Sequence, residues 1–165
     1  MSAIASFYLL NTSSLEELKR HADVIFEKSW FLKKTTDNFW GYLANNATAL
    51  NSFDGSGYLY ADVLVYLQQE KNIDLMTNQY DAIAKELADK RGSSLFLFSH
   101  DQKNSFLTLL DPALFSLIEI QKFNEEFSGD ADRETAALMI DAIKILHGNL
   151  SKIENEKQLL LLIIG

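Results

Sequence analysis

Residues 158–164 read Gln-Leu-Leu-Leu-Leu-Ile-Ile, an apolar run with no polar position after its first residue. A short continuous run of this kind is typical of a β-strand buried on both faces. It is too short to cross a bilayer, since a membrane-spanning helix needs about 20 apolar residues. We therefore expect a strand near 158–164 that lies in the core, and no membrane association.

Two further segments have the character of strands. Residues 3–10 (AIASFYLL) contain β-branched and aromatic residues and stop at Asn11-Thr12-Ser13, as a strand that enters a turn does. Residues 94–99 hold the run Leu95-Phe96-Leu97-Phe98 between two serines, and we expect this segment to be the central strand.

Helical spacing of apolar residues fills most of the remaining chain. Ser13 and Ser14, each with a glutamate three residues on, predict a capping box, as does Ser116 with Glu119. Thr36 and Thr77 are predicted helix caps, and Gly92 and Gly129 are predicted helix ends. The expected helices cover residues 15–26, 36–50, 58–71, 77–91, 100–110, 116–128 and 132–153, the last with Gly148 as a potential break.

These elements predict an α+β fold in which a small, mostly buried sheet, with strands near 3–10, 94–99 and 158–164, is covered by six or seven helices. The 165 residues suit one domain, and no linker or repeat divides them, so we expect residues 1–165 to form a single domain. The apolar cluster Trp30-Phe31-Leu32 fits either an edge strand or a packed loop.

The charge balance excludes several classes of partner. Fifteen basic and 23 acidic residues give a formal charge of −8, which repels the phosphates of DNA and RNA, so no nucleic acid is expected to bind. The first ten residues lack the basic region of a secretory signal, and the chain has no cysteine, so we expect a cytoplasmic protein without disulfides. An acidic chain of this kind suits a basic protein partner.

The segment Asp54-Gly55-Ser56-Gly57 is glycine-rich, but it lacks the lysine of a phosphate-binding loop and no strand precedes it. The simpler interpretation of this segment is a turn. Because aromatic side chains flank it, Asp54, Tyr58 and Tyr60 are candidate ligand-binding residues, while the alternative is that these rings pack into the core.

His100 and Asp101 directly follow the predicted strand at 94–99, a position where α/β sheets place ligands and catalytic groups. They are the second pair of candidate ligand-binding residues, although His100 is also placed to cap the next helix. The three histidines are scattered, and the common hydrolase and deaminase motifs are missing from the sequence. We therefore expect no metal, no cofactor and no catalytic residue.

Two features resemble a known family. They are the segment Phe39-Trp40-Gly41-Tyr42-Leu43 before a glycine-bearing loop, and the C-terminal order of a helix after Asp111-Pro112, a long helix, and a strand that ends at Ile163-Ile164-Gly165. This layout is similar to that of the bacterial YfbM-like proteins, whose function is unknown. The resemblance implies a small bacterial cytoplasmic protein of α+β fold, and it assigns no functional residue.

Two hypotheses of function follow. The first is a non-catalytic interaction protein, in its sharper form an immunity-type inhibitor of a basic partner, because the chain is small, acidic and without catalytic motifs. The second is a small-molecule-binding protein or enzyme with a pocket formed by Asp54–Tyr60 together with His100-Asp101. The second requires that these two segments meet in space. The oligomeric state is not specified by the sequence.

Overall fold

The computed structural model describes residues 3–28 and 33–165. At its centre is a four-stranded sheet with the order β4-β1-β6-β5, in which every neighbouring pair is antiparallel. The strands are β1 (Ala5–Asn11), β4 (Ala47–Ala49), β5 (Ser94–Phe98) and β6 (Gln158–Ile164). The three strands expected from the sequence are confirmed, and the fold is α+β as predicted. β5, however, lies at the edge of the sheet, and β1 and β6 occupy its middle.

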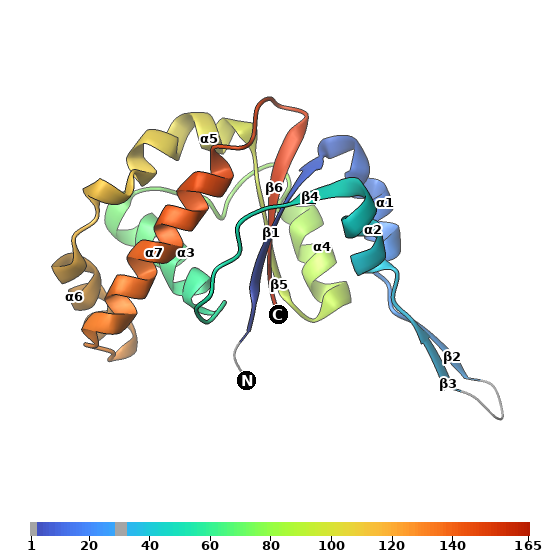
Figure 1. Cartoon of the computed structure of the whole chain (residues 1–165), viewed down its shortest axis with the longest axis horizontal. Helices are drawn as coiled ribbons and strands as arrows, with labels where there is room; N and C mark the ends of the chain where they lie inside the picture. Colours follow the sequence, from blue (N-terminus) through green and yellow to red (C-terminus); the bar gives the residue numbers. More distant parts are fainter. Residues whose placement is uncertain (1–2, 29–32) are drawn as a thin grey trace.

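Helices cover both faces of this sheet (Figure 1). On one face, the core joins even-numbered residues of β6, such as Leu160 and Leu162, to the buried sides of four helices. These helices are α3 (Leu59–Lys71), α5 (His100–Phe106), α6 (Leu117–Ser128) and α7 (Arg133–Leu150). α7 runs through Gly148 without a break, and a short 3-10 helix at Leu107–Leu110 follows α5.

On the other face, odd-numbered residues of β6, such as Leu161 and Ile163, pack against three helices. These are α1 (Leu15–His21), α2 (Phe39–Asn46) and α4 (Asp81–Arg91). β6 therefore contributes a row of buried side chains to each of two separate cores. The protein is built as three layers, with the sheet between two helical layers.

A two-stranded hairpin of β2 (Ile25–Lys28) and β3 (Lys33–Thr36) projects from the body of the protein (Figure 1). The helix predicted for residues 15–26 is wrong beyond His21, because the apolar stripe ends at the buried Ala22 and the β-branched Val24 and Ile25 favour extended backbone. The cluster Trp30-Phe31-Leu32 lies outside the described residues.

Several predicted caps are wrong because their side chains have other partners or other positions. Ser14 and Ser116 precede helices without a capping hydrogen bond, and Glu119 instead accepts from Lys71 Nζ at 2.8 Å. Thr36 ends β3, and the N-cap of α2 is Asn38; Asp37, just before it, accepts a hydrogen bond from Phe39 N at Oδ1 at 3.1 Å.

Two helix boundaries also differ from expectation. α4 begins at Asp81 rather than after Thr77, because Thr77 N donates to Asp74 within a turn that precedes the helix. α2 stops at Asn46, since the next three residues leave the helix to pair with β1 as β4. The predicted glycine ends at Gly92 and Gly129 are confirmed, and both have positive φ angles of 61° and 76°.

One ion pair connects elements of the helical layer formed by α1, α2 and α4. Arg91, at the end of α4, donates from Nη1 and Nη2 to the two carboxylate oxygens of Asp37 at 2.9 and 2.7 Å. Its guanidinium lies 4.6 Å from the centre of the Phe39 ring and donates to the carbonyl oxygen of Ala22 after α1. The side chain of Arg91 is only 9% exposed, and its contacts with Asp37, Phe39 and Ala22 hold the base of the hairpin against α1 and α4.

We expect Arg91→Met to lower the free energy of unfolding by about 2 kcal/mol at pH 7, because it removes charge-assisted hydrogen bonds from a partly buried carboxylate. Hydrogen bonds from Arg91 hold the pKa of Asp37 below its usual range. The pair therefore stabilises the fold above the usual pKa of aspartate, and this contribution is lost as the pH falls through the lowered pKa. Urea unfolding across pH should show the gap between wild type and variant shrinking below about pH 4.

The matched control is Arg20→Met, since Arg20 forms an ion pair with Glu17 in which both side chains are at least half exposed. This variant should change stability by less than about 0.5 kcal/mol. An equal loss in both variants, or a gap for Arg91→Met that stays constant from pH 7 to pH 3, would contradict the anchoring role of Arg91.

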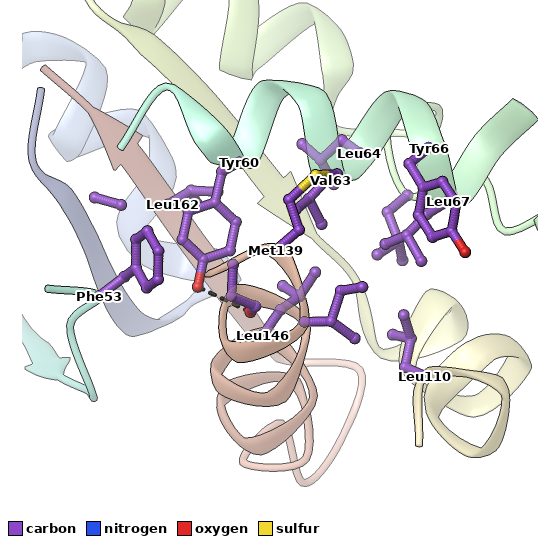
Figure 2. Close-up of a cluster of buried hydrophobic side chains, with 14 of the residues drawn as sticks. Phe53, Tyr60, Val63, Leu64, Tyr66, Leu67, Leu110, Met139, Leu146 and Leu162 are labelled. Atoms are coloured by element: carbon purple, nitrogen blue, oxygen red, sulfur yellow. Dashed lines mark hydrogen bonds between the residues drawn. The ribbon is translucent and has the colours of Figure 1, made fainter. Parts of the chain in front are cut away.

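Two buried tyrosines in the first core differ in their hydrogen bonds (Figure 2). The hydroxyl of Tyr60 donates to the carbonyl oxygen of Ala142 in α7 at 3.0 Å. The hydroxyl of Tyr66 has no partner among the described residues, and it lies at the outer edge of the cluster drawn in Figure 2. Burial raises the pKa of both hydroxyls, so both stay protonated at neutral pH.

Tyr60→Phe is expected to cost about 1 kcal/mol of unfolding free energy, because one buried hydrogen bond is lost. Tyr66→Phe removes a hydroxyl that is not paired with the protein, so it should leave stability unchanged or raise it. Urea denaturation of the two variants makes the comparison. A loss of more than about 1 kcal/mol in Tyr66→Phe would mean that its hydroxyl has a partner after all.

Candidate functional site

The structure separates the two halves of the predicted site. β5 runs from Ser94, which pairs with Ile164, to Phe98, which pairs with Leu160. His100 and Asp101 therefore follow the end of the sheet marked by Leu160. Phe53 instead bridges to Ala5, the residue of β1 that pairs with Ile164. Asp54 and Asp101 thus lie at opposite ends of the sheet, and one pocket cannot contain both.

The loop before α3 holds its position through backbone contacts. Gly57 N donates to the carbonyl oxygen of Ala3 at 2.8 Å. A Cβ atom on Gly57 would lie 2.9 Å from the backbone nitrogen of Ala5. Glycine is therefore required where these two backbone segments approach each other. Tyr58 is the N-cap residue of α3 and is 62% exposed, whereas Tyr60, in the first turn of α3, is buried in the core.

The residues after β5 form a polar network rather than a catalytic pair. Ser99, not His100, caps α5 in a complete capping box: Ser99 Oγ accepts a hydrogen bond from Gln102 N, and Ser99 N donates one to Gln102 Oε1. Asn78 Nδ2 donates to Gln102 Oε1 at 3.0 Å and to the carbonyl oxygen of Leu97 at 2.7 Å. These bonds fix the loop before α4 against the open edge of β5, so we interpret the network as structural.

Each candidate polar residue of this end has a defined place. His100 is half-buried and its Nδ1 lies 3.3 Å from Asn104 Nδ2, one helical turn later. Asp101 is exposed and lines a shallow cavity of about 410 Å³ together with polar residues of the loop before α4. No histidine and carboxylate pair within hydrogen-bond distance is seen among the described residues here.

A larger cavity, of about 610 Å³, lies between the loop before α3 and the outer side of α7. Of the predicted site residues, Asp54 lines it. The α7 residues on its other side were not identified from the sequence, where Gly148 was noted only as an interruption of the helical pattern. The residues that line the cavity are Asn51, Phe53, Asp54, Gly55, Leu138, Asp141, Lys144, Ile145 and Gly148.

Charge is divided unequally between the two sides of the fold. We call residues 1–50 and 81–93, which include α1, α2, α4 and the hairpin, the neutral half, because they carry eight acidic and eight basic residues. Residues 51–80 and 94–165, which include α3, α5, α6 and α7, carry fifteen acidic and seven basic residues and are called the acidic half. The entire net charge of −8 therefore comes from the acidic half.

Ion pairs strengthen this difference. In the neutral half, Lys19, Arg20, Lys90 and Arg91 all pair with carboxylates of the same half. In the acidic half, the described residues form the pairs Lys71–Glu119 and Lys122–Glu126. Many carboxylates of the acidic half thus have no ion-pair partner within the part of the chain that the structure describes.

The strongest concentration of charge is the turn between α6 and α7. Residues 125–134 contain five acidic side chains and one arginine. Within this stretch Phe127 is 49% exposed, and Ile118, on the same helix, is 76% exposed. We call residues 117–134 the acidic edge; it combines a net negative charge, from six acidic and two basic residues, with the exposed apolar side chain of Phe127.

The described residues show neither a metal centre nor a membrane-spanning helix. No group of three or more His, Asp or Glu side chains in residues 3–28 and 33–165 is arranged to hold a metal ion. Over the same ranges, none of the helices has the length and apolar character to cross a bilayer.

Comparison with known proteins adds no assignment, since the chain matches no family model, no curated protein and no solved structure. The resemblance to the YfbM-like proteins therefore stays a prediction.

Proposed function

We propose that this chain is a non-catalytic cytoplasmic interaction protein that binds a basic protein through its acidic half. The observation that supports this proposal is the division of charge, since the whole excess of negative charge lies on one side of the sheet. A surface of one sign raises the association rate and the specificity for a partner of the opposite sign.

The acidic edge is the part of this surface that suits a protein partner best. Protein interfaces combine apolar anchors with a polar rim, and the anchors contribute most of the affinity. Phe127 would be the apolar anchor, and Glu125, Glu126 and Glu134 would form the charged rim around it. A basic partner with an apolar patch matches both features.

A specific form of this proposal is an immunity-type inhibitor, which neutralises a basic toxin by covering its cationic surface. A neighbouring gene that encodes a basic toxin would support this form. A charge pattern of this kind also disfavours nucleic acid as the partner, because its phosphates would meet the same unpaired carboxylates.

The test compares two triple variants with the same change of charge. Glu125→Gln, Glu126→Gln and Glu134→Gln neutralise the acidic edge, and Glu16→Gln, Glu17→Gln and Asp89→Asn neutralise exposed carboxylates of the neutral half. Each set changes the formal charge from −8 to −5. Tagged wild type and both variants are used to capture partners from the native cells at low salt, where attraction between charges is strongest.

We expect wild type and the neutral-half variant to capture the same basic protein in stoichiometric amount. With that purified protein, the acidic-edge variant should associate on the order of tenfold more slowly, and the difference should vanish at high salt. A partner that binds all three proteins equally, or the lack of any basic partner above background, would overturn the proposal.

A further inference from the structure

The cavity between α7 and the loop before α3 has the size and walls of a small-molecule site. Its volume of about 610 Å³ falls within the usual range for ligand pockets, roughly 300–1,000 Å³. Its apolar wall consists of Phe53 on the loop and of Leu138 and Ile145 on α7. Such walls suit the hydrocarbon part of a ligand, which gains from contact with apolar side chains.

The loop side of this cavity is held in place by packing. The Phe53 ring is buried and lies edge-on to the ring of Tyr60, with 5.4 Å between ring centres (Figure 2). A Cβ atom on Gly55 would lie 2.4 Å from the Phe53 ring, so glycine allows the ring its position. Asn149 Nδ2 of α7 also donates to the carbonyl oxygen of Asn51 at 2.9 Å, which joins the two walls.

Gly148 keeps the helical wall open. It lies in the last turn of α7, where glycine costs up to about 1 kcal/mol relative to alanine. Neither packing nor backbone geometry requires it, because a Cβ atom there would meet nothing within 4 Å and its φ is not positive. A larger side chain at this position would instead occupy space in the cavity.

The charged groups at the cavity define the ligand. Asp54 and Asp141 supply two carboxylates and Lys144 one ammonium, and among the described residues none of the three is in an ion pair. The cavity also belongs to the acidic half, whose field attracts cations. We infer that the cavity binds a small organic cation, namely an amine with an aliphatic or aromatic body. Its ammonium group pairs with Asp54 and Asp141, and its body packs against Phe53, Leu138 and Ile145.

The test uses 2-phenylethylamine and hexylamine as probes, with 2-phenylethanol and hexanol as neutral controls of nearly the same shape. Binding is followed by calorimetry and by amide chemical shifts in NMR spectra of the full chain. We expect saturable shifts in residues 53–55 and 138–148 with the amines. The alcohols should bind at least about threefold more weakly, because they lose the exposed ion pairs with Asp54 and Asp141.

Variants separate the contributions of space and charge. Gly148→Leu should weaken amine binding at least tenfold by filling the cavity, whereas Gly148→Ala should retain it. Gly41→Leu is the matched control, since Gly41 lies in α2 with open space around its Cβ position and away from this cavity. Asp54→Asn and Asp141→Asn should each weaken binding about threefold, and Lys144→Met should strengthen it.

Equal binding of amines and alcohols, unchanged binding in Gly148→Leu, or the absence of saturable binding would overturn the inference. The triple variant of the acidic edge should still bind the amines, because none of its three positions lines the cavity. Loss of the cation site and loss of the protein partner are therefore distinguishable.

Discussion

The burial of β6 on both faces is the constraint on which the rest of the structure depends. Its odd-numbered and even-numbered apolar side chains enter two different cores, and neither set can be exposed without a large loss of apolar burial. One helical layer would cover only half of these side chains. The chain therefore places helices on both sides of the sheet, and most of its charged side chains lie on the two outer surfaces.

This arrangement keeps the charges of the two outer surfaces far apart. Each layer lies about 10 Å from the next, so exposed charges on opposite surfaces are separated by well over the screening length of about 8 Å in physiological salt and interact only weakly. The ion pairs around Lys19, Lys90 and Arg91 neutralise one surface internally. They cannot compensate the carboxylates of the acidic edge on the opposite surface. The same sheet that supports the fold thus leaves one surface charged and available to a cationic partner.

The sequence predicts those parts of the fold that depend on local patterns. β1, β5 and β6 were identified to within about two residues because their apolar runs are continuous. The order of the strands was not predictable, because pairing is chosen between segments such as β1 and β6 that are far apart in the chain. The predicted cap at Ser116 failed for a similar reason, since its intended partner Glu119 binds Lys71, which lies 48 residues away.

The candidate site, too, was predictable only where its residues are close together in the sequence. Asp54 was identified from a glycine-rich segment between aromatic residues, and it does line a cavity. The opposite wall of that cavity comes from α7, which no local pattern connects to Asp54. Asp101 is a candidate because it follows a strand, and the small-molecule hypothesis requires it to lie near Asp54; the direction of β5 in its antiparallel pairing with β6 instead carries Asp101 to the far end of the sheet. Gly148 was the one visible sign of the α7 wall, as an unexplained glycine in a helical pattern.

β6 contributes buried side chains to both cores, and paired truncations on its two faces test this arrangement most directly. Leu161 faces α1, α2 and α4, while Leu162 faces α3 and α7, and both are fully buried. We predict that Leu161→Ala and Leu162→Ala each lower the free energy of unfolding by about 2–5 kcal/mol, as measured by urea denaturation. A loss below about 1 kcal/mol at either position would show that this face of β6 is not covered by a packed core, and it would contradict the three-layer account.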